Sequence, residues 1–133
     1  MAALPVAAFA VMVTGGAAAS ELGVARATVP FAFDLDGERM EAGRYVFEPA
    51  YGTWLVTARP ERGKPVSFLG SPVGGPSSPR EAKLVFYLVD GRYYLAEVWM
   101  AGTGAGKRAP VNKEIEFSAR RGAVKRIEVA VNR

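Results

Sequence analysis

The chain of 133 residues contains neither histidine nor cysteine. Without cysteine the protein forms no disulfide and has no thiolate nucleophile, and without histidine it has no histidine-dependent catalytic triad. The nitrogen and sulfur ligands that zinc prefers are absent for the same reason. Carboxylates are the only general acids or bases present in quantity. We therefore expect a protein without a metal ion or a cofactor.

Charge is missing from the start of the chain. Residues 1–20 have no charged side chain, and Leu4–Val13 is almost continuously apolar. Ala17–Ala19 supply the small residues of a cleavage site, so residues 1–19 are predicted to be a signal peptide, and the mature protein to be periplasmic or extracellular. A retained membrane anchor is the alternative, although Pro5 and the few large apolar side chains disfavour it.

Residues 20–133 are predicted to form a single domain. Half of the whole chain is apolar and 23% is charged, a composition typical of globular proteins. The remaining 114 residues are enough for one hydrophobic core without disulfides. Charge is uneven, because residues 107–133 have a net charge of +5 and residues 20–106 a net charge of −1.

Apolar and polar side chains alternate with a period of two in several segments, which predicts β-strands. Turn residues such as Asp-Gly separate these segments. Near the C-terminus, Asn112 is a suitable N-cap and Gly122 a suitable stop for one short helix. The expected strands cover residues 29–35, 44–48, 54–58, 66–69, 83–89, 92–99 and 124–131, and the expected helix covers residues 113–121.

Lys83–Val89 and Arg92–Trp99 are predicted to form a β-hairpin joined by an Asp-Gly turn. Regular pairing places Glu97 opposite Leu84, on the face that also carries Trp99. Both faces of the hairpin are apolar, so we expect other elements to cover it on each side. The predicted fold is mainly β, an antiparallel β-sandwich or partly open β-barrel of about seven strands with one short C-terminal helix.

Four segments of the sequence resemble an uncharacterised family of small exported bacterial β-rich proteins. They are Val29–Phe33 (VPFAF), Ala42–Pro49 (AGRYVFEP), Lys83–Phe86 (KLVF) and Arg92–Trp99 (RYYLAEVW). The resemblance runs through most of residues 28–100, and the hairpin with its terminal tryptophan is its most specific part. It implies export and a β fold, and it implies no activity.

Two glycine- or acid-rich segments resemble ligand-binding loops only in part. Gly102–Lys107 lacks the first glycine and the final Ser or Thr of a phosphate-binding loop, so we interpret it as a flexible connection. Asp34–Glu38 has the alternating oxygens of a calcium loop but not its remaining ligands. An ordinary Asp-Gly turn between strands explains it better.

Glu97 and Glu48 are weak candidates for a catalytic pair, since a glycosidase needs two carboxylates about 5–10 Å apart. A carboxylate in an apolar strand needs a partner, and pairing of Glu97 with an Arg or Lys near the end of the sheet is the simpler interpretation. We therefore expect that the protein is not an enzyme, and keep a small carboxylate-dependent hydrolase acting on glycosides as an alternative.

Basic residues are expected to gather on loops. If the first six strands run up and down in order, the connections after the second, fourth and sixth strands emerge at one end. These connections contain Tyr51, Arg80, Lys107 and Arg108. Such a basic rim, held by a rigid scaffold, favours an anionic or carbohydrate ligand.

The primary functional prediction is therefore an exported, non-catalytic binding or structural module of the cell envelope. Its partner is expected to be an anionic polymer, a carbohydrate or another envelope protein, and nucleic acid is not expected. A further alternative is an interaction subunit that docks by a sheet edge, at Val29–Leu35 or through the last strand.

Overall fold

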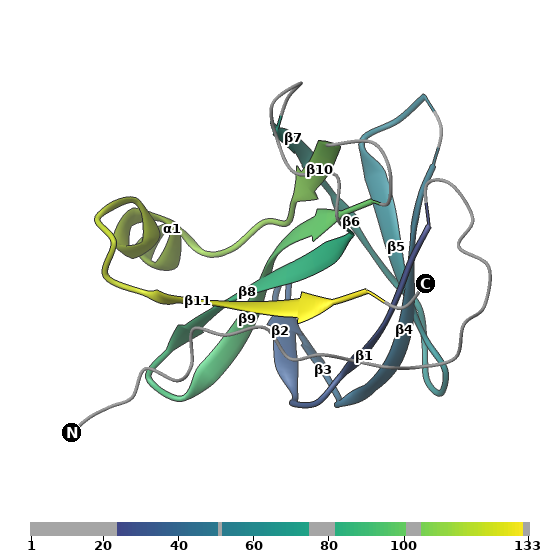
Figure 1. The fold of residues 1–133 in the computed structure, drawn as a ribbon, viewed down its shortest axis with the longest axis horizontal. Coiled ribbons are helices and arrows are strands. Elements are labelled where there is room, and N and C mark those ends of the chain that lie inside the picture. The colour runs from purple at the N-terminus through teal and green to yellow at the C-terminus, as the bar shows by residue number, and fades with distance from the viewer. Residues whose placement is uncertain (1–23, 51, 75–81, 101–104, 132–133) are drawn as a thin grey trace.

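The computed structural model describes residues 24–50, 52–74, 82–100 and 105–131, which form eleven β-strands and one α-helix (Figure 1). The predicted signal peptide and two of the predicted site residues, Tyr51 and Arg80, lie outside these ranges. The strands are β1 (Ala25–Val29), β2 (Phe33–Leu35), β3 (Glu38–Met40), β4 (Gly43–Pro49), β5 (Leu55–Pro60), β6 (Val66–Leu69), β7 (Ser71–Gly74), β8 (Lys83–Val89), β9 (Arg92–Trp99), β10 (Ala105–Arg108) and β11 (Lys125–Ala130), and the helix is α1 (Lys113–Arg120).

The strands form two sheets that face each other. The first sheet has the order β1-β4-β5-β6, and the second has the order β11-β8-β9-β10-β7, with the β2–β3 hairpin attached to β9. All pairings are antiparallel except the short one between β2 and β9. The chain passes from β6 to β7 through Gly70, and the second sheet curls around the core (Figure 1). The predicted mainly β fold is confirmed.

Side chains fill the space between the sheets. The alternating burial of β1 and β4 places every second residue inside, as half-buried strands require. Aromatic rings cross the interior, with the centroids of Phe33 and Phe86 5.2 Å apart in an edge-to-face arrangement. The largest fully buried side chains are Phe33, Phe47, Phe68, Phe86, Leu35, Leu84 and Leu95. Each contributes about 1.5–3 kcal/mol of hydrophobic stabilisation.

The β8–β9 hairpin lies in the middle of the second sheet, as predicted. Asp90 and Gly91 both have positive φ, 49° and 79°, which is the geometry of a type I′ turn. The register is regular as far as Phe86, which pairs with Leu95. Beyond that pair, Val85 faces Glu97.

One extra residue, Ala96, therefore forms a β-bulge in β9. The predicted pairing of Leu84 with Glu97 is wrong, since Leu84 faces Val98. Because side chains alternate between faces, the bulge moves Glu97 and Trp99 to the outer face of the sheet. Val98 takes their place in the core.

The segment predicted as one strand over residues 29–35 is divided between the two sheets. β1 ends at Val29 and pairs with β4, whereas β2 begins at Phe33 and pairs with β3 and β9. Pro30 follows the end of β1 directly and has no N–H to continue a ladder. The edge that we expected over Val29–Leu35 is therefore not one continuous strand. β1 and β11 each stand at the end of a sheet order.

Two segments predicted as loops contain strands. β7 and β10 pair with each other and extend the second sheet beyond β9. The pairing of β10 with β9 needs a glycine at Gly106, because a Cβ atom there would lie only 2.8 Å from the Trp99 ring. Pro72 is tolerated because β7 is the last strand of its sheet. We predicted a flexible connection over Gly102–Lys107. This prediction is wrong for residues 105–107, which belong to β10.

The helix begins and ends close to the predicted positions. The side-chain oxygen of Asn112 accepts a hydrogen bond of 2.9 Å from the backbone N–H of Ile115. Only Ile115 of this helix is buried, so α1 stands beside the sheets instead of within the core (Figure 1). Among the described residues, no helix is long and apolar enough to span a bilayer.

Candidate functional site: a cleft beside the β9 bulge

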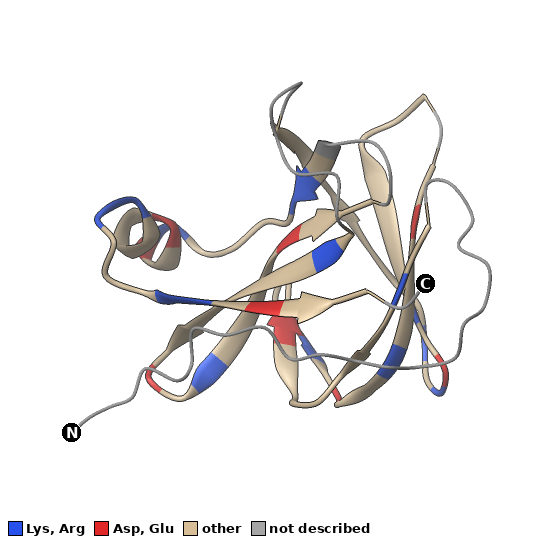
Figure 2. Ribbon diagram, in the orientation of Figure 1, with Lys and Arg blue, Asp and Glu red and all other residues tan. Residues whose placement is uncertain are grey.

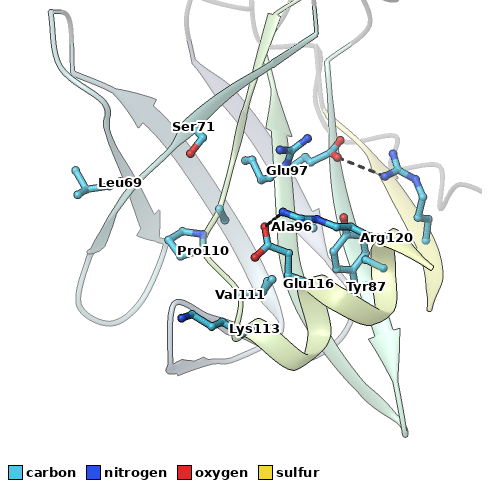
Figure 3. A pocket seen from close by; sticks show the side chains of 14 residues that line it. Leu69, Ser71, Tyr87, Ala96, Glu97, Pro110, Val111, Lys113, Glu116 and Arg120 are labelled. Carbon is cyan, nitrogen blue, oxygen red and sulfur yellow. Dashed lines mark hydrogen bonds and ion pairs between the residues drawn. The ribbon is translucent and has the colours of Figure 1, made fainter. Parts of the chain in front are cut away.

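A cleft of about 520 Å³ separates α1 from the outer face of the second sheet (Figure 3). The sheet side of the cleft is lined by Ser71, Tyr87, Ala96, Glu97, Arg108 and Arg126. The opposite side is lined by Pro110, Val111, Lys113, Glu116, Ala119 and Arg120. Strands thus provide one wall, and the helix with the segment that leads into it provides the other.

The bulge in β9 shapes the cleft directly. The backbone N–H of Ala109 donates a hydrogen bond of 2.8 Å to the carbonyl of Ala96, the bulged residue. This bond fixes the point where the chain leaves β10 and turns toward α1. An irregularity that the sequence does not reveal therefore positions the far wall of the cleft.

Glu97 is the one buried charged residue in the described part of the chain, with 5% of its surface exposed. Its Oε1 accepts a hydrogen bond of 2.8 Å from Trp99 Nε1, and its Oε2 accepts one of 3.3 Å from Arg126 Nη1. The expected pairing with a nearby base is confirmed. A carboxylate has about four acceptor sites, so two remain for a ligand after these bonds.

Arg108 lies directly beside Glu97. In the register of the second sheet, Arg108 of β10 faces Glu97 on one side and Ser71 of β7 on the other. The three side chains therefore form a row on the outer face, where cross-strand neighbours have Cβ atoms about 5 Å apart. A carboxylate, a guanidinium and a hydroxyl are brought side by side on paired strands.

Four basic and two acidic residues line the cleft. The ribbon in Figure 2 shows basic residues on α1, on β10 and at the start of β11. Of the four bases in the cleft, Arg126 pairs with Glu97, and Arg120 pairs with Glu116 at 3.3 Å within the helix. Arg108 and Lys113 form no ion pair with any residue that the structure describes. Two cations are therefore available to a ligand, and Tyr87 and Pro110 add apolar surface to the cleft.

Of the predicted basic rim, Tyr51 and Arg80 lie outside the described residues, and the structure places only Lys107 and Arg108. Lys107 and Arg108 are both in β10, and as consecutive strand residues they point to opposite faces. Arg108 lines the cleft, whereas the Lys107 ammonium lies 5.2 Å from the centre of the Trp54 ring. Three further bases of the cleft were not predicted as site residues, although the charge excess of residues 107–133 includes them: Lys113, Arg120 and Arg126.

The structure does not bring the two candidate catalytic carboxylates together. Glu48 is in β4 of the first sheet, where it forms an exposed ion pair of 3.2 Å with Arg59. It does not line the cleft that contains Glu97. Asp34, from the calcium-like turn, binds Arg39 and Arg92. Within the described ranges, no group of three or more acidic side chains could hold a metal ion.

The chain matches no protein-family model, no curated protein and no solved structure.

Proposed function

We propose that the chain is an exported, non-catalytic binding module of the cell envelope that holds an acidic carbohydrate in the cleft between α1 and β9. The observation that carries this proposal is the row of Glu97, Arg108 and Ser71 on the outer face. Its acceptors and donors match a sugar unit that has both hydroxyl groups and a carboxylate. Export is supported by the apolar segment over residues 1–19 and by the family resemblance.

The chemistry of each group fits this ligand. The planar guanidinium of Arg108 has paired donors that match a carboxylate. Glu97 has spare acceptor capacity for sugar hydroxyls, and Ser71 can donate or accept. The Tyr87 ring and Pro110 offer apolar surface to the C–H faces of a sugar ring. Polar groups that converge beside apolar surface in a cleft are typical of small-ligand sites.

Binding is favoured over catalysis because both acidic side chains of the cleft are held by bases. Glu97 is bonded to Trp99 and Arg126, and Glu116 to Arg120. These contacts keep the carboxylates in fixed positions as hydrogen-bond acceptors. Glu48 is on the other sheet and does not line the cleft, so it does not form a catalytic pair with Glu97.

Isothermal titration calorimetry with digalacturonate, a disaccharide of uronic acid, tests the proposal. We expect saturable binding with 1:1 stoichiometry that weakens as salt is raised. Arg108→Ala should weaken it about tenfold, equivalent to about 1.4 kcal/mol, a typical value for a charge-assisted hydrogen bond. Arg62→Ala is the matched control, since Arg62 is exposed in the β5–β6 turn and does not line the cleft.

Two results would overturn the proposal. One is the absence of saturable binding by the wild-type protein. The other is an equal loss of affinity in Arg108→Ala and Arg62→Ala, since this would show a general effect of positive charge and no specific site.

A further inference from the structure

A second, shallower cavity of about 300 Å³ adjoins the cleft at the corner between the two sheets. Trp54, Leu69, Gly70, Ser71 and Pro72 line it, and we call it the Trp54 groove. Leu69 and Ser71 line the cleft as well. The two cavities are therefore neighbours on one continuous surface, and a single elongated ligand can contact both.

The Trp54 groove is apolar and exposed. Trp54 is 57% exposed and Leu69 is 65% exposed, so the core does not account for either side chain. The backbone of Trp54 is nevertheless held in a defined position, because its carbonyl accepts a hydrogen bond of 2.7 Å from Gly70 N–H. Thr53 stabilises the same turn, since its hydroxyl bonds the carbonyl of Ala50. An exposed ring on a fixed turn suits recognition of a flat partner.

A cation accompanies the ring. The Lys107 ammonium lies 5.2 Å from the centre of the Trp54 ring, and Lys107 forms no ion pair with a described residue. Lys107 and Arg108 follow each other in β10 and point to opposite faces, so this strand places one cation beside the Trp54 ring and one in the cleft. A ligand that lies across both cavities would meet positive charge at two separate places.

We propose that the Trp54 groove is a second subsite for the same acidic carbohydrate, and that the ligand is an oligosaccharide with a negative charge on successive sugar units. This inference rests on the proposed function. One sugar unit stacks on Trp54 with its carboxylate near Lys107, while another occupies the cleft beside Arg108. Linking two such contacts in one chain raises the affinity above that of either alone.

The affinities of digalacturonate and hexagalacturonate, measured by calorimetry on the same protein, test the subsite. For the wild-type protein we expect the hexamer to bind at least tenfold more tightly than the dimer. Trp54→Ala should remove this advantage, with a tenfold loss for the hexamer and less than a twofold loss for the dimer. Lys107→Gln should weaken hexamer binding and reduce its salt dependence, and Arg108→Ala should weaken both ligands.

Phe117→Ala is the matched control. Phe117 is 59% exposed, and Arg121 lies 5.3 Å from its ring centre, so it repeats the combination of ring and cation outside both cavities. This variant should bind both ligands as the wild-type protein does.

The outcomes separate the two proposals. If the hexamer binds no more tightly than the dimer, or Trp54→Ala weakens both ligands equally, the subsite is overturned and the cleft proposal stands. If neither ligand binds the wild-type protein, both proposals are overturned.

Discussion

The indole N–H of Trp99 donates a hydrogen bond of 2.8 Å to Oε1 of Glu97, two residues earlier on the same strand. Residues two apart in a strand share a face, and the bulge at Ala96 makes this the outer face. Arg126 of β11 binds the second carboxylate oxygen. The buried charge is thus compensated by one neutral and one charged donor, and the resulting arrangement forms one wall of the cleft.

Glu97→Ala is predicted to lower the free energy of unfolding by about 2 kcal/mol. The substitution leaves the buried Trp99 N–H without its acceptor, and the loss at Arg126 is smaller because 48% of that side chain is exposed. Glu97→Gln should cost less, since the amide oxygen can still accept from Trp99. Urea denaturation measures both changes.

Glu48→Ala is the control for that series, because its pair with Arg59 is exposed on both sides and should contribute less than about 0.5 kcal/mol. Equal effects of Glu97→Ala and Glu48→Ala would contradict the structural role of Glu97.

Gly106→Ala is predicted to destabilise the protein by about 1–3 kcal/mol, as expected for overpacking. The added Cβ atom would lie 2.8 Å from the Trp99 ring and 3.0 Å from the Val98 carbonyl oxygen. In a Trp99→Leu background the same substitution should cost less, because the ring is gone. A double-mutant cycle by chemical denaturation checks this, and strict additivity of the two substitutions would count against the contact.

Stability should fall at alkaline pH because of Tyr45. Burial raises the pKa of the Tyr45 phenol above its ordinary value of 10.0, and the negative charge of Glu41 acts in the same direction. The folded protein therefore keeps a proton that the unfolded chain releases. The associated stability is complete below about pH 10 and is lost as the pH rises through the folded-state pKa.

Denaturant unfolding of wild-type protein and Tyr45→Phe between about pH 9 and 11 tests this linkage. The variant should lose less stability over that range than the wild-type protein. Tyr94→Phe, at a partly exposed position of β9, is the control for removal of a phenol. Parallel pH profiles for the wild-type protein and Tyr45→Phe would refute the assignment.

Asn112→Ala is predicted to weaken α1 by about 1 kcal/mol, because its side chain caps the first turn. The helix has eight residues and one buried side chain, so the packing available to compensate is small. Hydrogen exchange of the amides of residues 115–120 should accelerate while the β8–β9 amides keep their protection. Asn112→Asp retains an acceptor and should exchange like the wild-type protein.

Much of the fold could be predicted because periodicity reports burial. The alternation in β4 and β11 predicted these strands and their inward faces, and the apolar runs on either side of Asp90-Gly91 predicted the β8–β9 hairpin and its turn. β7 and β10 were missed because their Gly and Pro residues show no alternation. Their pairing depends on neighbouring strands that are distant in sequence.

The candidate site was harder to predict because it depends on one bulge. Regular pairing placed Glu97 opposite Leu84, whereas the bulge pairs it with Val85 and the bonds of Ala96 and Glu97 to Ala109, Trp99 and Arg126 accompany this shift. Arg108 was chosen for its expected place on a loop, yet it reaches the cleft from a strand. Charge alone could not show that Arg108 lines the cleft while Lys107 lies beside the Trp54 ring.

The packed core between the two sheets limits which ligands the protein can bind, because it leaves only the outer surface for them. Side chains fill the space in which a β-barrel with an internal ligand site would have a cavity, among them Phe33, Phe47 and Phe86. Under the proposed function, a polysaccharide would lie along the outside of the protein, and neither of its ends would have to enter the fold. The protein would then recognise internal sugar units of a long chain, whatever the chemistry of its ends.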